Sequence, residues 1–247
     1  YSADARNRPL GAVYAITALW ERLGLAATLS KAQQAEGCTV PYERALLGMT
    51  AHRLCEPTSK LGVWDRWFPT VWLPDCDALK RAQMYEAMDL LHRHAAATEE
   101  AVFFQTADLL NLVVDVVFYD TTNLQYAIDG SDDDGLRQLG RTKEGGYAPQ
   151  VVVALAVPRE GLPVRSWVFP GNTSDMTTVE RIKTDLRGWK LGRALFVADA
   201  GMNSEDNRET LAQACGRYLL ATRAGSVLEI QREVLSRAGR YRVISDT

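Results

Sequence analysis

The chain has 247 residues, of which 47% are hydrophobic and 24% are charged, a composition that argues against intrinsic disorder and suffices for one large or two modest hydrophobic cores. No stretch approaches the roughly 18 to 20 uncharged apolar residues that a membrane span needs, and the N-terminus lacks a secretion signal, so we expect a soluble cytoplasmic protein without a membrane partner. The four cysteines form no C-x-x-C pair, which argues against a zinc site and indicates free thiols.

Charge is distributed unevenly along the chain. The net charge is −3, yet residues 181–242 hold twelve Lys and Arg against seven Asp and Glu, while residues 129–134 hold four acids and no base. A basic C-terminal third can face phosphate groups, although a solvated surface of mixed charge explains the same numbers equally well. Because the sequence begins at Tyr1 instead of Met, we expect a piece of a longer protein.

The first 112 residues are expected to form helices. Apolar residues recur at helical spacing in four stretches, and no strand-like alternation interrupts them. These stretches begin near Val13, Pro41, Asp77 and Thr98. We therefore predict an all-α N-terminal domain over residues 1–112, which could bind DNA ends.

From residue 113 onward, the pattern becomes that of strands and connecting helices. Strands are expected over 113–120, 148–158, 162–171, 193–200 and 217–223. One helix is expected to begin with the capping-box pair Thr177 and Glu180, and a second near Asn203. The order β-β-β-α-β-α-β, three antiparallel strands followed by two α-β units, predicts an α/β fold with an RNase H-like mixed sheet over residues 113–247.

Two of the predicted apolar strands lead into aspartates, Asp120 and Asp199. These strands are the first and fourth, which are neighbours in an RNase H-like sheet, so parallel pairing would bring both carboxylates to one edge. Adjacent carboxylates repel each other unless a cation lies between them, and such oxygen ligands suit Mg²⁺ or Mn²⁺. We predict a two-metal site for phosphodiester chemistry. Thr121 and Thr122 could orient Asp120 or bind a phosphate, and β-propensity alone explains them equally well.

Other classes of protein also place an aspartate after an apolar strand. Receiver domains and haloacid-dehalogenase-like phosphatases do so, but both need a strictly alternating α/β order, and the second needs Asp-x-Asp where this chain has Thr122. The segment DGSDDDGL (129–136) suggests a calcium loop, but the only start that places Glu144 at position twelve is Asp133, which puts Gly and Arg at ligand positions. A solvated loop is therefore expected there.

Longer motifs are more specific. They are FYDTTNLQY (118–126), GYAPQVVVAL (146–155), GLPV (161–164), FPGNTSDMTT (169–178), FVADAGMNSEDN (196–207) and YLLATR (218–223). Together they resemble the DDE-type transposases of bacterial insertion sequences, in the branch whose RNase H-like catalytic domain carries a β-rich insertion. The resemblance extends into the helical part through residues 8–25 and 43–67.

This resemblance implies that Asp120 and Asp199 are the first and second acids of the catalytic triad. It further implies metal-dependent hydrolysis at transposon ends, strand transfer into target DNA, Mg²⁺ or Mn²⁺ as cofactor, and a homodimer within a transpososome in the bacterial cytoplasm. Asn172 and Asp175 match the GN-T-x-D stretch of the family, which implies a position near the site, and a turn stabilised by its own Asn and Asp explains them as well.

The third carboxylate departs from the family pattern. In the resembling family it is a Glu after the insertion, on a helix with Tyr and Arg upstream, and no such pattern occurs before Thr247. We therefore expect a C-terminally truncated and inactive chain. Two alternatives stay open: a non-catalytic DNA-binding remnant, and a stand-alone RNase H-like nuclease that uses Glu229 or Glu233.

Overall fold

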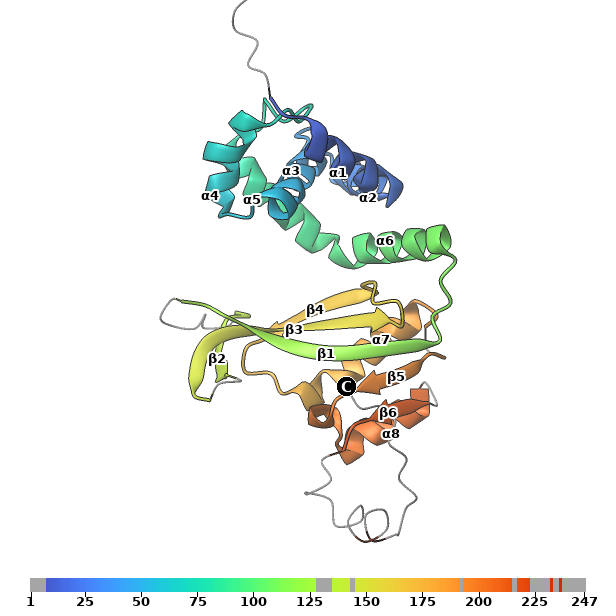
Figure 1. Ribbon diagram of the computed structural model, residues 1–247. Helices are drawn as coiled ribbons and strands as arrows, with labels where there is room; N and C mark the ends of the chain where they lie inside the picture. The colour runs from blue at the N-terminus through green and yellow to red at the C-terminus, as the bar shows by residue number, and fades with distance from the viewer. Residues whose placement is uncertain are drawn as a thin grey trace, which may run out of the picture. The chain divides into compact units, whose positions relative to one another are not determined.

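The chain divides into two compact units, Tyr1–Val113 and Val114–Thr247, drawn in Figure 1. The computed structural model describes residues 8–127, 135–142, 145–191, 193–214, 217–222, 232 and 236. Within these ranges, no helix is long and apolar enough to cross a membrane. Residues 129–134, Glu144, Glu229 and Glu233 lie outside them, so the calcium-loop and alternative-Glu hypotheses fall on residues that the structure does not describe.

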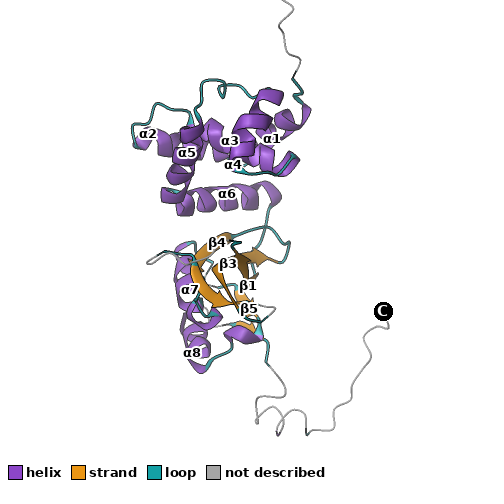
Figure 2. Ribbon diagram, turned by 90° about the vertical axis from the view of Figure 1, so that its left-hand side faces the viewer, coloured by secondary structure: helices purple, strands orange, loops and turns teal. Residues whose placement is uncertain are grey.

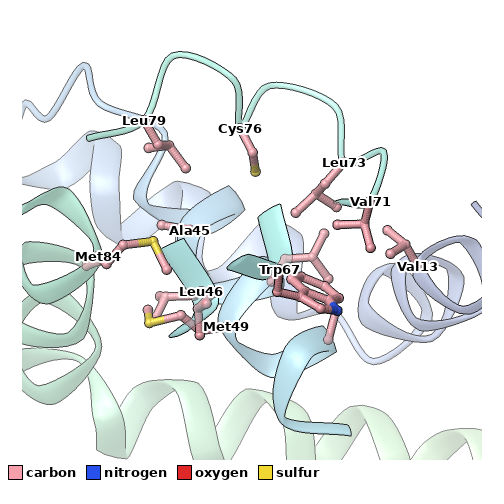
Figure 3. Packing of buried hydrophobic residues seen from close by; sticks show 14 of the residues in the cluster. Val13, Ala45, Leu46, Met49, Trp67, Val71, Leu73, Cys76, Leu79 and Met84 are labelled. Carbon is pink, nitrogen blue, oxygen red and sulfur yellow. The ribbon is translucent and has the colours of Figure 1, made fainter. Parts of the chain in front are cut away.

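In its described part, the first unit contains helices as its regular elements. They are α1 (Gly11–Arg22), α2 (Leu25–Ala35), α3 (Tyr42–Cys55), α4 (Lys60–Gly62), the π-helix η1 (Val63–Trp67), the 3₁₀-helix η2 (Phe68–Thr70), α5 (Arg81–Arg93) and α6 (Ala95–Leu110). Buried side chains from several helices, among them Leu46, Met49, Trp67 and Met84, form one hydrophobic core, seen from close by in Figure 3. Burial of these apolar side chains stabilises helices that would be only marginally stable in isolation.

The second unit is a mixed sheet with two helices. Its elements are β1 (Val116–Gln125), β2 (Gln138–Arg141), β3 (Tyr147–Pro158), β4 (Arg165–Pro170), the 3₁₀-helix η3 (Asp175–Thr177), α7 (Val179–Gly188), β5 (Leu195–Ala198), the 3₁₀-helix η4 (Ala200–Met202), α8 (Glu205–Ala214) and β6 (Tyr218–Leu220). The longest path of the sheet is β2-β3-β1-β5-β6, and β4 also pairs with β3. Pairing is antiparallel among β1, β2, β3 and β4 and parallel among β1, β5 and β6.

Strand β2 corrects the expected order, because four strands instead of three precede α7. Its sequence QLGR carries no alternating apolar pattern, and its pairing with Tyr147–Gln150 of β3 is what makes it a strand. Gly140 of β2 is required by a close approach: a methyl carbon there would lie 1.9 Å from the carbonyl oxygen of Gly171. A short strand that depends on a distant partner leaves little local signal.

The two faces of the sheet differ. Figure 2 shows α7 and α8 on one face, where Tyr119 of β1 stacks on Phe196 of β5 with ring centroids 5.7 Å apart. Side chains alternate between faces along a strand, and Val117, Tyr119 and Thr121 are buried on the helix-covered face. Phe118, Asp120 and Thr122 point to the opposite face and are exposed. The alternation therefore directs Asp120 away from the helices.

Candidate active site

Strand register brings the two predicted aspartates level with each other. Strands β1 and β5 pair in parallel, ending with Phe118 opposite Val197. Asp120 lies two positions beyond Phe118 within β1, and Asp199 lies two positions beyond Val197, directly after β5 ends at Ala198. The parallel pairing of these two strands, expected from the order of elements, is thus present in the sheet.

The apolar pattern predicted that the first strand ends at Asp120, but the strand continues beyond it. Strand β1 continues to Gln125 and pairs with β3 all the way, whereas β5 stops at Ala198. The expected end of the first strand was wrong because Thr121 and Thr122 keep the strand conformation and the antiparallel ladder on the β3 side. Asp120 therefore lies inside β1, beside the point at which its parallel neighbour ends.

Both carboxylates are held by backbone N–H groups. The N–H of Thr121 donates to Asp120 Oδ1 over 2.7 Å, and the N–H of Gly201 donates to Asp199 Oδ1 over 3.0 Å. Both aspartates are exposed, and within the described part of the chain no Lys, Arg or His pairs with either one. Both carboxylates are consequently oriented by backbone groups, and no basic side chain among the described residues neutralises them.

Asp175, the first residue of η3, is hydrogen-bonded to β1 and borders the same space as Asp199. Its Oδ1 accepts a hydrogen bond of 2.8 Å from the hydroxyl of Thr121, a buried side chain of β1. A methyl carbon built on Gly201 would lie 3.4 Å from Asp175 Oδ2 and 3.2 Å from Asp199 Oδ1. The absence of a side chain at Gly201 therefore keeps open a space that two carboxylates border.

The segment around η3 is also tied to Tyr119. The phenol of Tyr119 donates to Thr178 Oγ1 over 2.8 Å, and the hydroxyl of Thr178 donates to the carbonyl oxygen of Asp175 over 2.7 Å. Burial, together with the negative charges of Asp175, Asp120 and Asp199, raises the pKa of Tyr119. Tyr119 is therefore a neutral hydrogen-bond donor at physiological pH and not a base.

The expected capping box at the start of α7 is absent. Thr178 occupies the N-cap position of α7, and its side chain makes no capping hydrogen bond. The hydroxyl of Thr177 donates to the carbonyl oxygen of Ser174 instead. The sequence spacing was right for a capping box, but the 3₁₀-helix η3 precedes α7 and shifts its start by one residue.

Asn172 lies in a polar cleft next to Asp175. The cleft has a volume of about 610 Å³ and is lined by residues from β1, β2 and β3 and by the connection from Gly171 to Asp175. Asn172 and Thr122 are exposed, and no hydrogen bond or ion pair joins either one to Asp120 or Asp199 in the described part of the chain. Of the four residues expected beside the site, Thr121 and Asp175 make hydrogen bonds there.

The described residues fit part of a metal site. They include no group of three His, Cys, Asp or Glu side chains placed to hold a metal ion. Mg²⁺, however, is commonly bound by one or two carboxylates, with water and substrate phosphate completing its coordination. Asp120 and Asp199 supply two such carboxylates, and the absence of a side chain at Gly201 leaves a space of methyl size beside Asp199 and Asp175. Two carboxylates are therefore a donor set that suits Mg²⁺ or Mn²⁺.

Sequence reasoning missed Tyr119, Thr178 and Gly201. Their partners are far away in the chain, since Tyr119 and Thr178 are separated by 59 positions. Gly201 stands in the VADAGM motif, and this glycine directly after the aspartate turn is the one signal that could have indicated a close approach.

The chain matches a family model and is similar to solved structures. The family model described as "Transposase DDE domain" matches residues 120–246, a range that starts at Asp120. No curated protein matches the chain. Among solved structures, the chain is similar to the piggyBac transposase in a synaptic complex with hairpin DNA, at 14% identity and a TM-score of 0.38, covering 79% of this chain and 44% of that one. It is also similar to the Mos1 transposase in a paired-end complex with the left transposon end, at 13% identity and a TM-score of 0.30, covering 90% and 62%.

Proposed function

Because this chain belongs to the transposase DDE domain family, we propose that it is part of a DNA transposase that cleaves and joins phosphodiester bonds at transposon ends. The observation that carries the proposal is the register of β1 and β5, which brings Asp120 level with Asp199. The strand order from β4 through β3, β1 and β5 to β6 supports assigning an RNase H-like fold, with β2 as an addition to it.

Asp120 and Asp199 are the proposed catalytic, metal-binding acids. A divalent ion bound at such a site lowers the pKa of an attacking water or hydroxyl and stabilises the leaving oxygen at phosphorus. The chain's own contribution is to orient both carboxylates through the N–H groups of Thr121 and Gly201. Thr122, exposed on the same face as Asp120, can donate its hydroxyl to a substrate phosphate.

Double-stranded DNA, both transposon ends and target, is the proposed substrate, and a homodimer is the proposed working unit. Both proposals follow from the family resemblance. The third acid, a Glu in the resembling family, is proposed to lie outside the described residues. Asn172, exposed in the polar cleft, is proposed to contact DNA and not the metal.

Cleavage of DNA that carries the element's ends tests this function. In a full-length form that includes this chain, Asp120→Asn or Asp199→Asn should lower Mg²⁺-dependent cleavage and strand transfer by about a thousandfold or more, because a lost metal ligand removes several kcal/mol of transition-state stabilisation. Asp206→Asn is the matched control, since Asp206 is an exposed acid on α8. Undiminished strand transfer in either site variant contradicts the catalytic assignment. DNA binding that needs no metal and is never followed by cleavage indicates a non-catalytic remnant.

A further inference from the structure

The pairing of β1 with β5 stops short of the two aspartates. The last paired residues are Phe118 and Val197, two positions before Asp120 and Asp199. Two like charges at this level repel each other, and no ladder hydrogen bond of the β1 and β5 pair holds the chains together there. Some other contact must therefore set the spacing of the carboxylates when no cation is bound.

Asp175 provides a contact to each side of this gap. On the β1 side, its Oδ1 accepts a hydrogen bond from the Thr121 hydroxyl, and the N–H of the same Thr121 holds Asp120. On the other side, its Oδ2 borders the space above Gly201, whose N–H holds Asp199. One side chain thus lies between the two residues that orient the catalytic pair.

The backbone of Asp175 is fixed as well. Its carbonyl oxygen accepts the Thr178 hydroxyl, which in turn accepts the Tyr119 phenol. Tyr119 and Thr121 are the two neighbours of Asp120 in β1, and both are buried on the helix-covered face. Both neighbours of the catalytic aspartate are therefore hydrogen-bonded to the segment Asp175–Thr178.

We propose that Asp175 is a positioning residue that sets the spacing of Asp120 and Asp199 through its hydrogen bond with Thr121 and its place beside Gly201. This inference rests on the proposed function and adds to it a residue that acts through the catalytic pair. Since Asp175 acts by hydrogen bonding, a neutral acceptor of the same shape can replace it. A direct metal ligand would instead need the negative charge.

Four variants separate these roles. Asp175→Ala removes the acceptor, while Asp175→Asn keeps an acceptor oxygen without the charge. Thr121→Val removes the donor at nearly constant shape, while Thr121→Ser keeps it. In the proposed account, the Ala and Val variants behave alike, and the Asn and Ser variants stay close to the wild type.

Hydrogen exchange of the metal-free chain is the first measurement, followed by mass spectrometry of peptides that cover 116–125 and 195–204. Asp175→Ala and Thr121→Val should accelerate exchange in both peptides by roughly two- to tenfold, the effect of one lost hydrogen bond. Asp175→Asn and Thr121→Ser should not. Unchanged exchange around Asp120 and Asp199 in Asp175→Ala overturns the proposal whether or not the chain binds a metal.

The second measurement is a Mn²⁺ titration. It is made at a temperature at which every variant is folded, as checked separately by urea denaturation. The Ala and Val variants should bind Mn²⁺ roughly 10 to 100 times more weakly, as is usual when a partner of a metal ligand is lost. If Asp175→Asn loses as much affinity as Asp175→Ala, Asp175 is a ligand and the positioning role is wrong. If Mn²⁺ binds equally well after Asp120→Asn, the proposed function fails, while the exchange result still decides the role of Asp175.

Discussion

Acidic residues of the helical unit and of the sheet unit are held in different ways. Glu43 in α3 is buried, with 6% of its surface exposed; it accepts a 2.6 Å hydrogen bond from Trp20 and pairs with the guanidinium of Arg44. Asp120 and Asp199 are exposed and held by backbone N–H groups, with no protein cation beside them in the described part of the chain. The charge of Glu43 is thus balanced inside the folded helical unit, whereas the charges of Asp120 and Asp199 are available to a bound cation.

Glu36 extends the comparison within the helical unit. Hydrogen bonds from Arg93 and His94 lower the pKa of Glu36 to about 2 from its ordinary value of 4.5. Because the pKa in the folded state is the lower one, the contribution of Glu36 to stability is present above its ordinary pKa and is lost as the pH falls toward 2. Like Glu43, it is an acid whose charge is already balanced by basic side chains of its own unit.

Glu43→Gln should have the largest effect on stability. The substitution leaves the mostly buried guanidinium of Arg44 without its carboxylate, and we expect the free energy of unfolding of the helical unit to fall by about 2–4 kcal/mol in urea denaturation. Glu100→Gln, at an exposed position of α6, should change it by less than about 0.5 kcal/mol. Unchanged stability of Glu43→Gln, or a loss of its Mn²⁺ affinity, would contradict the distinction between an acid that stabilises the fold and acids that bind a cation.

Gly201→Ala should have a smaller and more local effect. Its methyl group would fill the space beside Asp199 and Asp175, at 3.2 Å and 3.4 Å from their oxygens. We expect Mn²⁺ affinity to fall by about tenfold, or about 1.4 kcal/mol, with stability nearly unchanged, because the tight contacts are with side chains that can move. Gly188→Ala, where a methyl group meets nothing within 4 Å, is the control. Equal Mn²⁺ affinity in both variants would show that the space above Gly201 is not used by a cation.

Features of this fold that depend on neighbouring residues could be predicted from the sequence, whereas features that depend on residues distant in the chain could not. Apolar runs located β1, β3, β4, β5 and β6, because a run of apolar residues is a local property of the sequence. The parallel pairing of β1 with β5 was predictable once the order of elements indicated which strands are neighbours. Strand β2 and the early end of β5 were not, since both depend on partners distant in the chain.

The hydrogen bond between Thr121 and Asp175 shows the same limit at the level of the site. The two residues are separated by 54 positions, and nothing in the local sequence of either one indicates the other. A family resemblance pointed to Asp175 as a neighbour of the site, but its contact with β1 required the folded chain. Long-range hydrogen bonds of this kind determine how a site is held, while short motifs indicate only which residues belong to it.

Calorimetry of Mn²⁺ binding to this chain tests most directly whether Asp120 and Asp199 form one shared cation site. Asp120→Asn, Asp199→Asn and the double variant should each abolish the same binding event, so that the double variant loses little more than either single variant. Asp206→Asn should bind as the wild type does. Independent losses that add in the double variant, or Mn²⁺ binding that survives both substitutions, would contradict the account.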